Sequence, residues 1–190
     1  MTGAAAYDDA DYHFETILDG TSIDGWKMCG PGMFFVLEDR MIISKGGMGL
    51  LWYTKKKFRD FILRVDWKTS RREDNSGIFI RFADPDDDPW IAVNTGYEIQ
   101  IYDAEPPQGN AMYRTGAVYD FARPSTFASK EPGKWNTFEI HAIGQNYTVI
   151  LNNKRVTGFT GSRQLEGYIG LQNHDAKSRV CFGTVAIRQL

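Results

Sequence analysis

The sequence predicts an all-β fold, a jelly-roll sandwich of two antiparallel sheets that forms a single domain over residues 1–190. Three observations predict it. Short runs of alternating apolar and polar residues recur throughout, bounded by Gly, Pro, Asn and Asp, and helical periodicity is not sustained over several turns. Aromatic residues, which favour strands, make up 14% of the chain. About ten expected strands with long connections exceed a minimal immunoglobulin-like sandwich, and they suit a jelly roll in which one sheet curves into a concave ligand-binding face.

The clearest strand is expected at residues 58–69. There Phe61, Leu63, Val65 and Trp67 alternate with largely charged residues, so that one face is apolar and the other is solvated. The same alternation predicts further strands at residues 77–82, 96–103, 135–143, 147–151, 154–156, 167–173 and 180–190. Prolines and glycines predict a long connection over residues 105–132, and residues 1–11 are a candidate for disorder.

Composition excludes some classes of partner. The formal net charge of -2 and the pI near 5.9 provide no basic field for a phosphate backbone or an anionic membrane surface, so we expect neither nucleic acid nor a membrane as partner. The first eleven residues contain neither a basic n-region nor an apolar h-region. We therefore expect a cytoplasmic protein as given, or a periplasmic or secreted one if a signal was removed. Association into a homo-oligomer stays open.

The two cysteines, Cys29 and Cys181, are far apart in the sequence and lack the spacing of metal ligands. They fit either two buried thiols or one disulfide, and we expect free thiols.

Polar residues are expected to converge on one sheet face. Alternation places Glu98 and Gln100 on the face opposite the core-facing residues of their strand, and it places Gln172 and His174 together at the end of theirs. Arg81 is expected to face the same side if its strand is a neighbour. Each residue also has an interpretation without a functional role. Glu98 would form a salt bridge to Arg81, and His174 would be a strand-end residue that is hydrogen-bonded to backbone.

A second set of candidate ligand-binding residues rests on weaker signals. Asn75 precedes a turn, and turns at a rim often contact sugar hydroxyls. Asp103 ends the strand of Glu98 in the opposite phase, so it joins the site if a bulge rotates it there. Tyr119 and Trp90 offer stacking surfaces for a sugar ring, and Asp66 belongs to a charged face that is equally explained as solvated surface.

Six ordered segments carry a resemblance to a known family. After the opening run at residues 14–26, with Asp24-Gly25-Trp26, these segments are residues 47–53, 74–81, 96–103, 115–119, 135–136 and 167–174. Over nearly its whole length the chain resembles the 3-keto-disaccharide hydrolase family, a group with a concanavalin A-like lectin/glucanase jelly roll. The resemblance implies action on a small-molecule glycoside already oxidised to a ketone at C3, with cleavage of the bond at C1.

The implied chemistry needs a base near C2 and a cation or strong donor near the oxygen at C3. A 3-keto group acidifies the C2 proton, so that its removal can expel the C1 substituent, and water can add back later. We expect Glu98 and His174 to supply the base and the metal ligands, and which residue has which role stays open. Arg81 would polarise the keto oxygen, and Gln100 would orient the sugar. A divalent ion such as Ca²⁺, Mg²⁺ or Mn²⁺ would serve as Lewis acid, and no organic cofactor is expected.

Two other functions compete with this one. A conventional glucanase needs two carboxylates across the scissile bond, and Gln100 stands where the strand would carry the second one. A carbohydrate-binding module without catalysis would use the same aromatic and polar face for binding alone.

Overall fold

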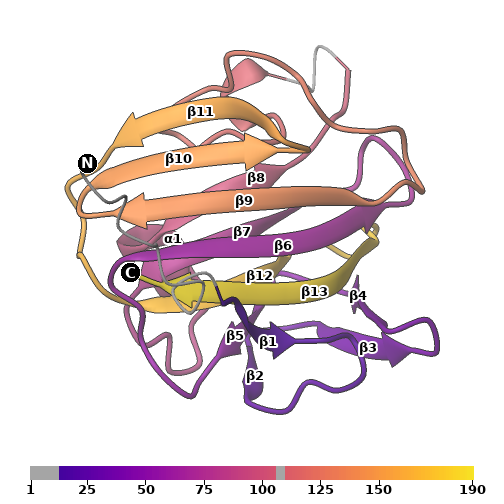
Figure 1. Ribbon diagram of the computed structural model, residues 1–190. Coiled ribbons are helices and arrows are strands. Elements are labelled where there is room, and N and C mark those ends of the chain that lie inside the picture. The colour runs from indigo at the N-terminus through magenta and orange to yellow at the C-terminus, as the bar shows by residue number, and fades with distance from the viewer. Residues whose placement is uncertain (1–12, 106–109) are drawn as a thin grey trace, which may run out of the picture.

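Two antiparallel sheets pack face to face in the computed structural model, which describes residues 13–105 and 110–190 (Figure 1). The predicted all-β jelly-roll sandwich is confirmed, whereas the segment 1–11, predicted as a candidate for disorder, lies outside the described residues. The large sheet has the order β11-β10-β9-β6-β13-β4-β3, and β1 pairs with β13 beside this path. Its strands are β1 (Glu15–Leu18), β3 (Met33–Leu37), β4 (Met41–Lys45), β6 (Phe61–Thr69), β9 (Asn136–Ile143), β10 (Asn146–Leu151), β11 (Lys154–Thr160) and β13 (Val180–Gln189).

The small sheet lies behind the large one in Figure 1 and has the order β2-β5-β12-β7-β8. Its strands are β2 (Trp26–Cys29), β5 (Gly49–Tyr53), β7 (Ser76–Phe82), β8 (Tyr97–Ile101) and β12 (Tyr168–Asn173). The short helix α1 (Trp90–Thr95) and the 3-10 turn η2 (Ala111–Tyr113) complete the described elements. Within the described residues no helix is long and apolar enough to span a bilayer.

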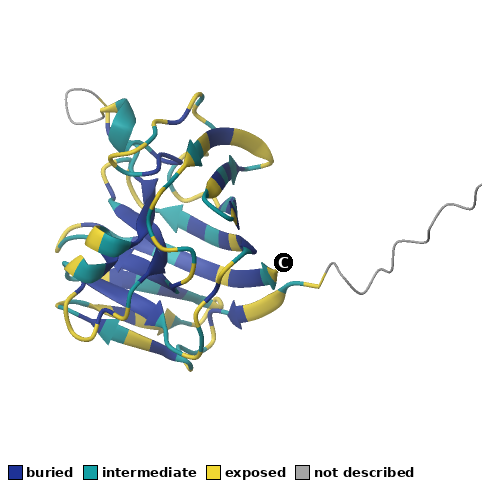
Figure 2. Ribbon diagram, turned by 90° about the vertical axis from the view of Figure 1, so that its left-hand side faces the viewer, coloured by how far each residue is buried: buried dark blue, intermediate teal, exposed yellow. Residues whose placement is uncertain are grey.

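The core lies between the two sheets, where Figure 2 shows the buried segments of both. In β8 the residues Tyr97, Ile99 and Ile101 face this core, as their alternation predicted. The strands expected from residue 58 onward are confirmed with bounds that shift by up to four residues. The strands β1 to β5 and the helix α1 were not predicted, because segments of four to six residues carry too few periods to reveal a pattern.

The two cysteines are free, as expected: Cys29 is buried and Cys181 is half-buried.

The prediction that Arg81 faces the same side of the sheet as Glu98 is wrong, because its side chain turns away from that face. It has a left-handed backbone, with φ of 53°, and the pairing of β7 with β12 shifts register at this point. This bulge inverts the alternation, so that Phe82 joins Phe79 on the outer side of the small sheet and Arg81 turns inward. The alternative interpretation of Glu98 as the salt-bridge partner of Arg81 is therefore wrong, and so is the prediction of Arg81 as a catalytic residue beside Glu98.

Arg81 instead ties the two sheets together. Its fully buried guanidinium pairs with Asp60 at 2.9 Å and donates to the Tyr147 hydroxyl at 2.9 Å. It also donates to three backbone carbonyls, those of Arg59, Ala142 and Gly144. A buried cation with this many partners acts in folding rather than at a ligand site.

Replacing Arg81 with glutamine is expected to lower the free energy of unfolding by about 3 kcal/mol, because it leaves Asp60 and several carbonyls without their donor. Urea unfolding would measure the change. Arg64→Gln serves as the matched control, since its pair with Glu139 is half-exposed and should change stability by less than about 1 kcal/mol. Equal losses of unfolding free energy in Arg81→Gln and Arg64→Gln would contradict the role of Arg81 in holding the two sheets together.

Candidate active site

A pocket of about 290 Å³ lies on the outer face of the small sheet. Strands β8 and β12 form its floor together with Asn75 just before β7, and α1 and the segment 110–119 form its walls. Its lining residues are mostly aromatic or hydrogen-bonding: Met48, Asn75, Trp90, Val93, Glu98, Gln100, Tyr102, Tyr113, Tyr119, Gln172 and His174. Seven residues predicted from the sequence are thereby brought together: Asn75, Trp90, Glu98, Gln100, Tyr119, Gln172 and His174.

The outer face of the small sheet is divided into an apolar half and a polar half. The apolar half is a cluster that α1 covers through Ala92, and it contains Cys29, Leu50, Trp52, Phe79 and Phe82. The polar half contains Glu98, Gln100 and Gln172, all nearly buried. Gly77 lies opposite Gln100 in the β7–β8 register, and a Cβ there would collide with the carboxyl of Glu98. The glycine therefore makes the space that this carboxyl occupies.

Glu98 is the one carboxyl group among the described residues that line this pocket, and it is 8% exposed. With its amide nitrogen turned toward it, Gln100 donates to Oε1 of Glu98 at 3.0 Å. Burial, reinforced by the negative charge of Asp120, raises the pKa of Glu98 to about 8, although a hydrogen bond from Gln172 opposes the shift. Glu98 is therefore protonated at neutral pH and can donate a proton.

His174 is held in one orientation by partners on both ring nitrogens. Its Nδ1 lies 2.9 Å from Oδ2 of Asp175, and its Nε2 lies 3.3 Å from Nδ2 of Asn75. Burial raises the pKa of Asp175, but hydrogen bonds from His174 and Ser178 lower it well below its usual range, so this carboxylate is ionised and accepts from Nδ1. The amide of Asn75 then donates to Nε2 and occupies the single lone pair of that nitrogen.

Two predicted site residues lie elsewhere. Asp66 belongs to β6 of the large sheet, where its Oδ1 accepts from Oγ1 of Thr137 at 2.6 Å, and it is separated from the pocket by the whole core. Asp103 follows β8 and does not line the pocket, because no bulge turns it there; its backbone N–H donates to the carbonyl of Arg72. Both predictions are corrected.

Four lining residues were not among the predicted site residues. Tyr102 continues the alternation of Glu98 and Gln100 one step beyond β8, so the pattern could have identified it. Tyr113 packs against Tyr119 with tilted rings whose centroids lie 4.8 Å apart, and Met48 comes from the segment before β5. Val93 comes from the unpredicted helix α1. No sequence periodicity connects these last three to the site.

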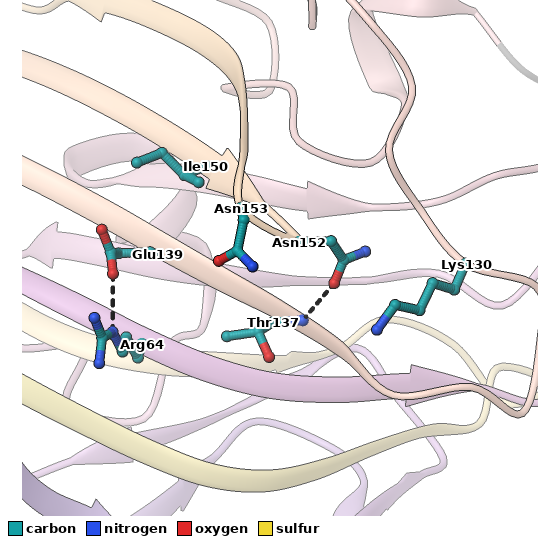
Figure 3. A pocket seen from close by; sticks show the side chains of 7 residues that line it. All are labelled: Arg64, Lys130, Thr137, Glu139, Ile150, Asn152 and Asn153. Atoms are coloured by element: carbon teal, nitrogen blue, oxygen red, sulfur yellow. Dashed lines mark hydrogen bonds and ion pairs between the residues drawn. The ribbon is translucent and has the colours of Figure 1, made fainter.

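A larger cavity of about 700 Å³ lies on the outer face of the large sheet, and Figure 3 shows its side chains. Its polar groups satisfy one another: Arg64 donates to Glu139 at 2.8 Å, and Oδ1 of Asn152 accepts from the backbone of Thr137 at 3.1 Å. Burial raises the pKa of Glu139, but His141 and Arg64 lower it below its usual value. The one carboxyl group among the described lining residues, Glu139, is thus ionised at neutral pH, so size alone does not make this cavity the candidate active site.

Comparison with known proteins identifies the family of the chain. Residues 13–189 match the model of the 3-keto-alpha-glucoside-1,2-lyase-like domain, which covers nearly the whole chain. The chain belongs to this family. The resemblance to 3-keto-disaccharide hydrolases drawn from the sequence is thereby confirmed. Among proteins with curated functions, none shows significant sequence similarity to the chain.

Solved structures resemble this 3-keto-glucoside lyase-like domain in fold. A proposed glycosyl hydrolase of Parabacteroides distasonis is 26% identical, with a TM-score of 0.70 over 83% of this chain and 90% of that one. A second one from the same organism is 21% identical, with a TM-score of 0.78 over 97% and 98% of the two chains. The carbohydrate-binding module CBM66 of Bacillus subtilis is 18% identical, with a TM-score of 0.62 over 87% and 96%. These relatives place the lyase-like domain among carbohydrate-related jelly rolls.

The divalent metal expected for the lyase-like domain stays a prediction. Glu98 and His174 line the same pocket, but in the described part of the chain no three His, Cys, Asp or Glu side chains form a metal-binding cluster. The donor set does not fit a resident ion, and the reaction proposed below takes no step through one.

Proposed function

We propose that this domain cleaves the C1 glycosidic bond of 3-keto-glycosides by removing the C2 proton and eliminating the C1 substituent. One observation carries the proposal. The same pocket contains an acid that is neutral at pH 7, Glu98, and an imidazole, His174, whose Nε2 accepts from the Asn75 amide and would take a proton once substrate displaces that amide. An elimination requires this pair, an acid for the leaving group and a base for carbon.

The reaction balances with these two groups. Nε2 of His174 takes the C2 proton, which the neighbouring ketone acidifies, and the electron pair moves to the C3 oxygen as an enolate. The enolate then re-forms the ketone, a C1–C2 double bond forms, and the C1–O bond breaks. The departing oxygen takes the proton of Glu98, and water that later adds across the double bond gives net hydrolysis. Asp175 accepts from Nδ1 and stabilises the imidazolium.

The other lining residues would bind the sugar. Gln100 and Gln172 are nearly buried amides beside Glu98, and Oε1 of Gln172 is a buried acceptor without a donor among the described residues. Trp90 is 54% exposed at the pocket wall and offers its ring face to the pyranose. Tyr119 lies on the wall formed by the segment 110–119.

The decisive experiment compares a 3-keto-glucoside with the same glucoside before oxidation. We expect turnover of the ketone, with exchange of the C2 proton in deuterated water, and no turnover of the unoxidised compound, because its C2 proton is not acidic. Parallel assays with EDTA and with added Mg²⁺, Ca²⁺ or Mn²⁺ examine the metal prediction. Equal rates on both glucosides would overturn the elimination.

A conventional glycoside hydrolase is the second candidate, and one observation favours it. Asp120 is close enough to raise the pKa of Glu98 by its charge, so a second carboxylate exists near Glu98 although Gln100 is not one. Turnover of an unoxidised glycoside that is abolished in Asp120→Asn would establish this function. Binding of both sugars without turnover of either would instead establish a carbohydrate-binding module.

A further inference from the structure

A second cavity of about 170 Å³ adjoins the candidate active site. Both cavities share Val93, Glu98 and Tyr119 in their linings, so these side chains stand between them. The other lining residues of the second cavity are Phe79, Asn94, Gly96, Asp120, Phe121 and Arg163. A substrate whose reacting bond lies at Glu98 would therefore extend from one cavity into the other.

Aromatic rings form one side of the second cavity. Phe121 is 43% exposed, and its ring lies edge-on to Tyr97 with centroids 5.2 Å apart. Phe79 is nearly fully buried, and Tyr119 is the wall shared with the main pocket. These rings give a planar ligand apolar surface to pack against.

Arg163 supplies a fixed positive charge in the same cavity. Its Nη1 donates to the carbonyl of Val93 at 2.9 Å and to that of Gly96, and its guanidinium carbon lies 5.0 Å from the centroid of Phe121. No carboxylate in the described residues lies within ion-pair distance of this guanidinium. Its charge is thus held in place by backbone and rings and is available to an electron-rich ligand.

The turn that carries Phe121 is conformationally restricted. Asp120 has a left-handed backbone, with φ of 64°, and the N–H of Phe121 donates to the carbonyl of Val118 at 2.9 Å. The hydroxyl of Tyr113 bonds to Asp120 and fixes this side chain beside the cavity. A non-glycine residue in this region costs free energy and is retained where the surroundings require it.

We propose that the second cavity is the leaving-group subsite and that it accepts a phenolic aglycone, a single aromatic ring joined through oxygen to C1. The ring would pack against Phe121 and Tyr119, and Arg163 would face the electron-rich ring and its oxygen as the C1–O bond breaks. That oxygen keeps the bonding electron pair and takes its proton from Glu98. The leaving-group role rests on the proposed function, but the binding of a phenol does not.

The experiment has one arm without catalysis. Binding of 4-fluorophenol is measured by ¹⁹F NMR in the wild type, in Phe121→Ala and in Arg163→Lys. The dissociation constant should rise about tenfold in Phe121→Ala. Phe127→Ala is the matched control, because Phe127 is also exposed, at 59%, and also lies under an arginine, Arg114, at 4.5 Å. The control should bind the phenol as the wild type does.

The second arm compares kcat/KM for phenyl, methyl and glucosyl 3-keto-glucosides. We expect Phe121→Ala to lower the phenyl-to-methyl ratio about tenfold and to leave the methyl compound unchanged. An unchanged phenyl-to-methyl ratio of kcat/KM together with unchanged phenol binding in Phe121→Ala would overturn the proposal. A loss of kcat/KM confined to the glucosyl compound would also overturn it, because the cavity would then be a sugar subsite. Phenol binding that depends on Phe121 in a protein that turns over no 3-keto-glycoside would support the phenol site and refute the proposed function.

Discussion

Replacing Glu98 with glutamine is expected to lower kcat/KM for methyl 3-keto-glucoside by at least about a hundredfold, because the leaving oxygen loses its proton donor. The effect should be smaller for a 4-nitrophenyl compound, whose leaving group needs little protonation. The wild-type rate should fall as pH rises through about 8, where Glu98 ionises, and this limb should be absent in the variant. Steady-state kinetics over a pH series measures the loss of kcat/KM, its dependence on the leaving group and the limb near pH 8.

Controls for this experiment come from the opposite sheet. Glu139→Gln changes a half-buried carboxyl on the outer face of the large sheet and should leave the rate intact. His174→Ala should lower the rate about as much as Glu98→Gln, but for all leaving groups alike, whereas His141→Ala should not. Equal losses for good and poor leaving groups in Glu98→Gln would remove the proton-donor role.

The same carboxyl is expected to make the fold less stable as pH rises. The pKa of Glu98 is about 8 in the folded protein against an ordinary value of 4.5, so its stabilising contribution is fully present below about pH 4.5 and is lost as pH approaches 8. The difference in unfolding free energy between wild type and Glu98→Gln should change by on the order of 4 kcal/mol over this range, in favour of the variant at high pH. Urea unfolding at a series of pH values measures it.

Asp120 provides the test of the cause. Because its charge adds to the raised pKa of Glu98, Asp120→Asn should move the stability change to lower pH without removing it. A wild type and a Glu98→Gln variant with parallel pH profiles would show that folding does not change the pKa of Glu98, and would contradict burial as the cause of a raised pKa.

Much of the fold and part of the site could be predicted from alternation. Tyr97, Ile99 and Ile101 face the core and Glu98 and Gln100 face the pocket, because a strand of regular pleat fixes both faces at once. The prediction failed at Arg81, where one left-handed residue inverts the pattern. A bulge of this kind leaves little local signal in the sequence.

The residues that distant segments bring to the candidate active site could not be predicted from the sequence. Asp66 and Glu98 are both acidic residues in alternating strands, and what separates them is that β6 joins the large sheet and β8 the small one. Tyr113 and Asp120 reach the site through irregular segments, whose path depends on many nonlocal contacts.

By itself, the sequence determined the class of fold, the family and the polar face of the strand that carries Glu98, because these depend on local alternation and on ordered segments. The tertiary structure decided which polar residues meet, that Arg81 serves the core and that the carboxyl of Glu98 holds its proton at neutral pH. The physical reason is desolvation: burial raises the pKa of Glu98, the charge of Asp120 adds to this shift and a hydrogen bond from Gln172 opposes it, and only folding brings these surroundings together.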